Sequence, residues 1–285
     1  MRLILHVGHG KTGTSWLQSW LAINSYLLEN KYNIRYTVES NNPSFRGQFS
    51  MGNSYVLEPY LSENTLPVNN LVDGLPLHGS LLFSGEKLMK ILPQKQSRLE
   101  EIALSLGTER PELVLMLRNP FDHALSLYNQ KIKSQGLKMS FANYLPMYDL
   151  PDKVLSFLRT YPSSHIFHYD NYRTKLYAPL LELLSLPYNE NWSFPSFQLI
   201  NRSLSQSEII FMRLCNYVFP KKLSKSIGKR LISFRPSLMN EKFKKRYDDK
   251  LIRDFNIRWR PIVDEINSYT HEESRLTLPA IDSFF

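Results

Sequence analysis

The sequence has very few of the residues that make covalent or metal cross-links. Its 285 residues include one cysteine, Cys215, which excludes an intrachain disulfide and a multi-cysteine zinc site. With 11 glycines and 17 prolines it is not collagen-like or low-complexity material. No stretch approaches the roughly 20 apolar residues of a membrane-spanning helix. The 42% hydrophobic and 21% charged residues indicate a globular protein rather than a disordered chain.

The N-terminal segment also lacks the features of an export signal. Its apolar run, Leu3 to Val7, is too short for a signal-peptide core, and no cleavage pattern follows it. We therefore expect a cytoplasmic protein, with peripheral contact at a membrane surface as an alternative.

The pattern of apolar residues favours an α/β fold with a mainly parallel sheet. Short apolar runs predict strands at 3–7, 34–38, 80–84, 113–117 and 166–169. Helical spacing follows from Thr14 to Leu27 and at 53–61, 121–133 and 171–184, and continues from Gln206 onward with breaks at Pro220 and Pro236. Strands that alternate with helices indicate a parallel sheet flanked by helices. We expect a single domain over 1–285, with an α/β core over 1–200 and a helical, basic C-terminal cap over 201–285.

A glycine-rich loop, residues 8–15, separates the first predicted strand from the first helix. The amides of such a loop, together with the positive end of the helix, make a cradle for phosphate, so we expect a fold of the P-loop type. In a Walker A loop the lysine follows the second glycine, but here Thr14 has that place and Lys11 lies inside the loop. This placement argues against an ordinary ATP or GTP enzyme. A P-loop nucleotide kinase is therefore only the alternative interpretation.

A second motif, Arg118-Asn119-Pro120, follows the strand predicted at 113–117. Asn119 and Pro120 suit the start of a helix, and Ser126 lies about two turns along it. Arg118 leaves the carboxyl end of its strand, where α/β sheets bind ligands. Its guanidinium group makes charge-assisted, bidentate hydrogen bonds to phosphate. This motif therefore indicates a second phosphate contact.

The two motifs together resemble those of the sulfotransferases that use 3′-phosphoadenosine 5′-phosphosulfate (PAPS). Residues 10–17, Gly-Lys-Thr-Gly-Thr-Ser-Trp-Leu, resemble the family's 5′-phosphosulfate loop, usually Pro-Lys-Ser-Gly-Thr-Thr-Trp-Leu. Residues 117–128 are similar to its 3′-phosphate motif, and His6-Val7-Gly8 resembles bacterial carbohydrate-type members. The resemblance implies PAPS as co-substrate, no metal, and sulfuryl transfer to a hydroxyl of a carbohydrate or glycolipid.

The resemblance also implies a role for each matching residue. The 5′-phosphate is held by the loop, whose lysine also contacts the bridging oxygen and the sulfuryl group; the loop residues are Gly10, Lys11, Thr12, Gly13, Thr14, Ser15 and Trp16. Arg118 and Ser126 hold the 3′-phosphate. Tyr169, in His168-Tyr169-Asp170, lies near the adenine, although Asp170 stands where glutamate is usual. Lys229 and Arg230 match, more loosely, a late basic segment that closes over the 3′-phosphate.

Deprotonation of the acceptor hydroxyl needs a general base near the phosphosulfate. We assign Glu86 to this role because it follows the strand at 80–84 and so reaches the carboxyl edge of the sheet. His78 and His9 are alternatives, since cytosolic members of the family use histidine. A structural alternative for Glu86 is a first-turn glutamate at a helix N-terminus.

The positive charge is concentrated in residues 221–253. This stretch has 12 basic and 3 acidic residues, which accounts for the whole net charge of +9. It could cover the nucleotide or acceptor, dock an anionic glycan or membrane lipid, or form a solvated helix face with local ion pairs. The alternative from another class is a basic nucleic-acid-binding protein, but no recognition motif accompanies the charge. Since both phosphate motifs lie outside the stretch, we expect a small-nucleotide enzyme and no nucleic-acid partner.

Overall fold

The computed structural model describes residues 1–39, 42–46, 52–62, 66–195, 206–233 and 248–280. The chain forms two compact units. The first contains Met1–Arg118, Asp152–Ile200 and Glu265–Leu276, and the second contains Asn119–Pro151, Asn201–Asp264 and Thr277–Phe285. The division therefore differs from the boundary predicted between 200 and 201, because Asn119–Pro151 groups with the C-terminal helices.

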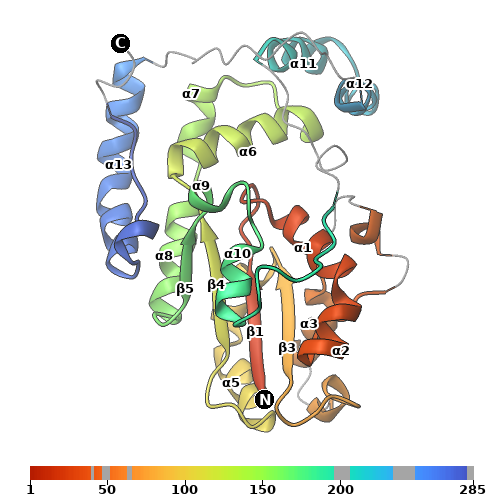
Figure 1. Cartoon of the computed structure of the whole chain (residues 1–285). Helices are drawn as coiled ribbons and strands as arrows, with labels where there is room; N and C mark the ends of the chain where they lie inside the picture. The colour runs from red at the N-terminus through yellow and green to blue at the C-terminus, as the bar shows by residue number, and fades with distance from the viewer. Residues whose placement is uncertain (40–41, 47–51, 63–65, 196–205, 234–247, 281–285) are drawn as a thin grey trace. The chain divides into compact units, whose positions relative to one another are not determined.

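The first unit is built on a five-stranded sheet in which all neighbouring strands are parallel (Figure 1). Its spatial order is β2-β3-β1-β4-β5, and the strands are β1 (Arg2–Val7), β2 (Ile34–Arg35), β3 (Ser80–Gly85), β4 (Glu112–Leu117) and β5 (His165–His168). Because the strands are parallel, their carboxyl ends share one edge. After β1 the chain forms β2 and β3 on one side of that strand and then β4 and β5 on the other, so the loop after β1 lies at the switch point where such sheets bind ligands. The predicted α/β fold class is confirmed.

Helices flank the sheet, and both of its faces are buried. The helices of this unit are α1 (Thr14–Ile23), α2 (Ser25–Tyr32), α3 (Ser54–Ser62), α4 (Leu88–Ile91), α5 (Gln96–Ser105), most of α8 (Leu150–Thr160), α9 (Tyr169–Tyr172) and α10 (Ala178–Leu183). Ile4, Leu82 and Val114 pack in one cluster with α1 and α10. The residues that alternate with them along the strands and face the other side of the sheet, such as Leu5 and Phe83, are buried as well. This explains why the strands read as continuous apolar runs.

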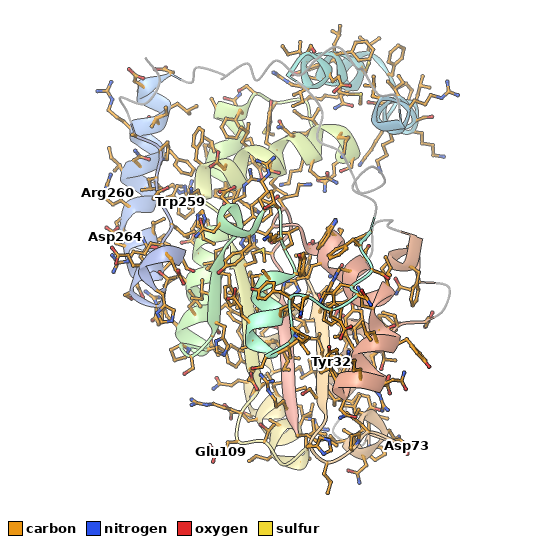
Figure 2. The ribbon with its side chains drawn as sticks, viewed as in Figure 1. Tyr32, Asp73, Glu109, Trp259, Arg260 and Asp264 are labelled. Carbon is orange, nitrogen blue, oxygen red and sulfur yellow. The ribbon has the colours of Figure 1, made fainter. Side chains whose placement is uncertain are left out.

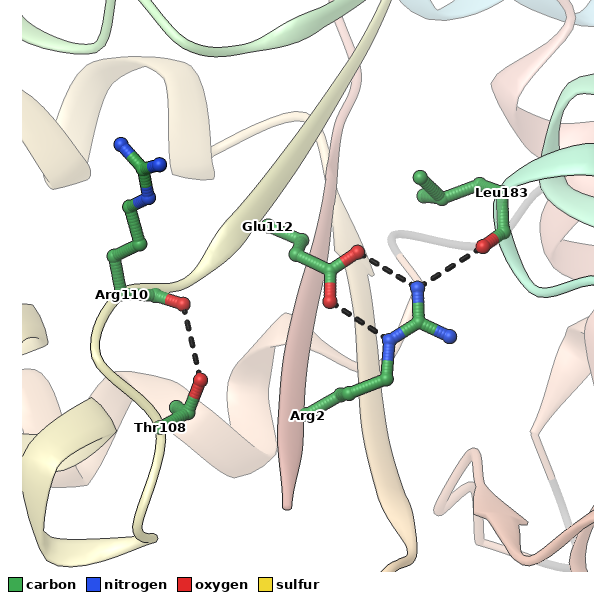
Figure 3. Close-up of polar contacts among 5 residues, drawn as sticks. All are labelled: Arg2, Thr108, Arg110, Glu112 and Leu183. Carbon is green, nitrogen blue, oxygen red and sulfur yellow. Dashed lines mark hydrogen bonds and ion pairs between the residues drawn. The ribbon is translucent and has the colours of Figure 1, made fainter.

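An ion pair joins β1 to β4 at the amino ends of the strands (Figure 3). The Arg2 guanidinium donates two hydrogen bonds of 2.7 Å to the Glu112 carboxylate and one of 3.0 Å to the Leu183 carbonyl. The hydrogen bond to Glu112 raises the pKa of Arg2 above its usual value. Since Arg2 is 37% exposed, the pair contributes about 1 kcal/mol or less. It fixes the alignment of β1 and β4 at the end opposite the glycine loop.

The second unit is helical. It contains α6 (Pro120–Gln135), α7 (Phe141–Tyr144), α11 (Gln206–Val218), α12 (Lys221–Ser233) and α13 (Asp249–Ser268) up to Asp264. Asn216 of α11 donates hydrogen bonds of 3.0 Å to the carbonyls of Ile132 and Leu137, and so ties α11 to α6. On α13, Trp259, labelled in Figure 2, meets the Tyr148 ring edge to face at 5.8 Å. Among the described residues from 206 onward, 206–218, 221–233 and 249–268 are helical.

Three predicted elements differ in length from the observed ones. The helix expected from Thr14 to Leu27 is interrupted at Asn24, which separates α1 from α2. The strand expected at 34–38 has only the two residues of β2. The helix expected over 171–184 is divided into α9 and α10. The break at Pro220 is confirmed, whereas Pro236 lies outside the described residues.

The part of the β3 edge that the two-residue β2 does not reach is covered by Asn53. Asn53 takes the place of a neighbouring strand: its side-chain oxygen accepts from the Ser84 amide at 2.7 Å, and its amide nitrogen donates to the Leu82 carbonyl at 3.0 Å. The Asn53 backbone amide also donates to the Ser84 carbonyl at 3.0 Å. These three bonds satisfy the edge that a longer β2 would otherwise cover.

Candidate active site

The glycine loop makes a tight turn between β1 and α1. Gly13 caps the N-terminus of α1 with φ at 75°, and a Cβ atom at this position would lie 2.4 Å from the Leu176 side chain. At Gly8, a Cβ would lie 2.6 Å from the Thr14 methyl group. Lys11 has φ at 73°, which is uncommon for a residue with a side chain. Left-handed backbone and close packing therefore require glycine at Gly13, and close packing favours it at Gly8.

Lys11 lies in the loop between two charged neighbours on adjacent strand ends. Burial lowers the pKa of Lys11 below its usual value of 10.5; the Glu86 carboxylate opposes this shift, and the Arg118 guanidinium adds to it. Its ammonium group has therefore lost part of its hydration without full compensation. A bound anion at this point would restore the lost stabilisation.

Glu86 lies directly against the glycine loop. The Thr14 hydroxyl donates a 2.8 Å hydrogen bond to Oε1 of Glu86, and a Cβ atom at Gly10 would be 3.3 Å from Oε2. The side chain is exposed. Lys87, rather than Glu86, is the N-cap residue of α4, so Glu86 precedes the helix and is not a first-turn glutamate. The first-turn position considered for Glu86 is therefore not observed.

Arg118 and Tyr169 meet at the ends of β4 and β5. The guanidinium carbon of Arg118 lies 5.2 Å from the centroid of the Tyr169 ring, a cation–π contact. Nε of Arg118 is buried and has no hydrogen-bond partner among the described residues. A buried, charged donor without an acceptor is costly, and an oxyanion is the partner that a guanidinium group binds best. This orphaned donor fits a phosphate group.

A buried polar network supports the end of β3 beneath Glu86. Nδ1 of His6 lies 2.8 Å from the Ser84 hydroxyl, which also accepts from Gln18 at 3.3 Å. Burial lowers the pKa of His6 to about 4, so the ring is neutral at pH 7. Sequence reasoning did not identify these supporting residues, because they come from separate segments. Their only local signal is a polar residue inside an apolar strand.

The other predicted residues are distributed as follows. Thr12 is buried in the loop, and Trp16 is buried in the first turn of α1, to which Ser15 also belongs. Ser126 belongs to α6 and Arg230 to α12, both in the second unit. Lys229 is also on α12, but its side chain lies outside what the structure describes. Roles for Ser126, Lys229 and Arg230 stay predictions.

The two histidine alternatives to Glu86 have different outcomes. His9 is buried in the loop itself, with Nδ1 at 3.3 Å from the Gly10 carbonyl oxygen, so it stays beside the site. His78 precedes β3 and contacts Asn33 at 3.3 Å. Because β3 has six residues, it separates His78 from the Glu86 edge by roughly 20 Å. His78 therefore does not fit the role of base.

Comparisons with known proteins give distant structural likenesses. No protein-family model matches the chain, and no curated protein matches it. The chain is similar to a solved sulfotransferase from Alicyclobacillus acidocaldarius, with 11% identity, a TM-score of 0.44, and coverage of 94% of this chain and 95% of that one. It is also similar to retinol dehydratase in complex with androsterone and the inactive cofactor PAP, with 12% identity, a TM-score of 0.37, and coverage of 98% and 84%. At these TM-scores, neither likeness assigns a function to the chain.

Proposed function

We propose that the chain is a sulfotransferase that moves a sulfuryl group from PAPS to a hydroxyl of a carbohydrate or glycolipid. The observation that carries the proposal is the convergence of Lys11, Glu86 and Arg118 on three neighbouring strand ends, with Nε of Arg118 buried and lacking an acceptor among the described residues. Both phosphate motifs of the sequence thus supply cations at one edge of the sheet.

Each of these side chains has a distinct task in the proposed reaction. Lys11 neutralises the charge that develops on the bridging oxygen as the sulfur–oxygen bond of the donor breaks. Arg118 holds the 3′-phosphate, and Tyr169, already against Arg118 at 5.2 Å, lies where the adenine would stack. The donor supplies an activated sulfuryl group. As in phosphoryl transfer, positioning and electrostatics provide most of the catalysis.

Glu86 accepts the proton of the acceptor hydroxyl as that oxygen forms its bond to sulfur. Thr14 fixes one carboxylate oxygen at 2.8 Å, which leaves Oε2 for the proton. The same carboxylate favours the charged form of Lys11 and so opposes the lowering of its pKa by burial. Glu86 thus combines the position of a base with electrostatic support of the lysine.

A cavity at the β2–β3 edge supports a carbohydrate as the acceptor. It has a volume of about 550 Å³, within the range of small-molecule sites. Its lining combines aromatic and polar side chains, among them Tyr26, Tyr60, Phe83, Asn30 and Asn70. Leu81 and Phe83 of β3 line the cavity, and Glu86 follows the last residue of that strand, Gly85.

The polar groups of this cavity fit a neutral ligand rich in hydroxyls. Arg35 forms a 2.8 Å ion pair with Glu29 and donates to the Asp73 carbonyl at 2.7 Å, so the charges of the lining compensate each other. Tyr36 is 2% exposed, and its hydroxyl has no partner among the described residues. A sugar hydroxyl would satisfy it, while the aromatic rings would contact the apolar faces of the sugar.

Thermal shift measurements with three ligands test the proposed class of enzyme. We expect stabilisation by 3′-phosphoadenosine 5′-phosphate without added metal, and little response to ATP-Mg²⁺ or an oligonucleotide. Stabilisation by ATP-Mg²⁺ alone would favour a nucleotide kinase. Binding to any oligonucleotide that weakens steeply with salt, with no response to the sulfonucleotide product, would favour a nucleic-acid-binding protein.

A Tyr36→Phe variant tests the acceptor cavity separately. Removal of a buried hydroxyl without a partner should raise the melting temperature, because the desolvation cost disappears. If the hydroxyl serves a sugar, the same change should raise KM for the acceptor about tenfold and leave donor affinity unchanged. Tyr188→Phe is the matched control, because Tyr188 is 51% exposed and does not line the cavity. An acceptor KM within twofold of wild type would contradict the assignment of the cavity.

A further inference from the structure

Helix α11 has a second apolar face that points to solvent. Ile210, Phe211, Leu214, Tyr217 and Val218 are between 48% and 65% exposed. Their spacing of i, i+1, i+4, i+7 and i+8 places them in one stripe that covers about a third of the helix circumference. A monomeric protein rarely leaves so many large apolar side chains together at its surface, so the stripe indicates an interaction site.

The core of the second unit does not require this stripe. The opposite side of α11 carries Met212, Cys215 and Asn216, which are buried, and it packs with α6 and α12. Phe219 and Leu223, at 41% and 48% exposure, continue the exposed apolar surface across the turn into α12. The outer face is therefore additional to the packing that holds the helices in place.

The charge around the apolar stripe is mostly positive. Helices α11 and α12 contain one acidic residue, Glu208 in the first turn of α11, and six lysines and arginines. Among them, Lys221, Lys222 and Lys225 are exposed at the start of α12, directly after the stripe along the chain. Two copies of the chain joined through this face would bring like charges together, which opposes dimerisation. An apolar face with basic residues beside it is instead the pattern of a helix that lies in the interface of an anionic membrane.

In the part of the chain that the structure describes, no helix has the length and apolarity needed to cross a bilayer. We propose that the outer faces of α11 and α12 dock the protein on the surface of an anionic lipid bilayer. The apolar stripe enters the boundary between headgroups and acyl chains, and the lysines of α12 contact the headgroup phosphates. The inference goes beyond the proposed reaction and rests on none of its catalytic residues.

Vesicle co-sedimentation of the full chain tests this proposal. The probes are phosphatidylcholine vesicles with and without one quarter phosphatidylglycerol. We expect binding to the anionic vesicles, and a partition coefficient at least tenfold lower for the double variant Phe211→Ser with Leu214→Ser. Ile257→Ser is the matched control, because Ile257 is 75% exposed on α13 of the same unit; its partitioning should stay within twofold of wild type. Circular dichroism verifies that each variant is folded.

A second pair of substitutions tests the electrostatic part. Lys221→Glu with Lys222→Glu should lower the partition coefficient by about tenfold or more, and added salt should weaken wild-type binding. Equal binding to neutral and anionic vesicles, or no binding to either, would overturn the proposal. So would a concentration-dependent dimer in light scattering that the Phe211 and Leu214 changes abolish, since a second copy would then cover the stripe. These outcomes do not depend on the thermal-shift result with the donor product, so the membrane proposal and the proposed reaction can fail separately.

Discussion

The replacement of Glu86 by glutamine isolates the role of its charge. The glutamine side chain keeps the size of glutamate, and its oxygen still accepts the 2.8 Å hydrogen bond from Thr14. The change from a charged to a neutral acceptor weakens that bond by about 1 kcal/mol, and less at an exposed position. The free energy of unfolding should therefore fall by about 1 kcal/mol or less, which keeps the enzyme folded.

The effect on catalysis should be much larger than the effect on stability. A positioned general base contributes about 10²- to 10⁴-fold, so kcat of Glu86→Gln should fall by about that factor. Affinity for 3′-phosphoadenosine 5′-phosphate should stay the same or rise a few-fold, because a negative charge near the phosphates is lost. Without its carboxylate neighbour, Lys11 should have a still lower pKa.

Initial-rate kinetics with PAPS, together with calorimetric titration of the nucleotide product, measure both effects. Lys87→Gln is the control, because Lys87 is the next residue and its side chain forms an exposed ion pair of 3.2 Å with Glu58. A Glu86→Gln enzyme with kcat within threefold of wild type would refute the assignment of the base. A fall in kcat accompanied by an equal loss of nucleotide affinity would show that Glu86 serves binding instead.

Three further predictions follow from the backbone and the buried groups. Gly52→Ala should lower the free energy of unfolding by about 2–5 kcal/mol, because φ is 76° and the new Cβ would lie 2.0 Å from the Ser84 carbonyl oxygen. Gly107→Ala is the control: φ is 73° but the space around the new Cβ is open, so the loss should be only about 1 kcal/mol. Equal losses for the two variants would show that the close contact with Ser84 does not matter. Burial lowers the pKa of His6 from 6.5 to about 4, so at pH 5 only the unfolded chain takes up a proton at this residue. The free energy of unfolding should therefore be about 2 kcal/mol lower at pH 5 than at pH 7. Urea titrations at the two pH values should show a smaller difference for His6→Gln. Binding of the nucleotide should raise the lowered pKa of Lys11, so calorimetry in two buffers at alkaline pH below 10.5 should detect proton uptake that Lys11→Met abolishes.

The parts of the fold that were predictable have local signals. The strands at 3–7, 80–84 and 113–117 are mostly apolar because both faces of a parallel sheet are buried. The loop and Arg118 are recognisable because each directly follows such a strand. His78 precedes the strand at 80–84, so the direction of that strand already places His78 at the edge opposite the glycine loop.

Other features depend on partners far away along the chain. The break between α1 and α2 occurs where the Asn24 side chain donates to the carbonyls of Trp20 and Ser193, both at 2.8 Å. Tyr32 at the end of α2, labelled in Figure 2, stacks on Trp192 at 5.9 Å. Helical spacing at 210–218 predicts α11 but cannot show that one apolar face stays exposed. These features become visible only when distant segments are placed together.

The central claim is that Arg118 provides a site for the 3′-phosphate of the donor nucleotide. A thermodynamic cycle measures this directly, with wild type and Arg118→Met each titrated with 3′-phosphoadenosine 5′-phosphate and with AMP, which lacks the 3′-phosphate. We predict that the substitution weakens the bisphosphate about 10- to 100-fold more than AMP, the coupling expected for a charge-assisted hydrogen bond of about 1.5–3 kcal/mol. Equal losses for the two ligands, or no loss for either, would contradict the proposed nucleotide site.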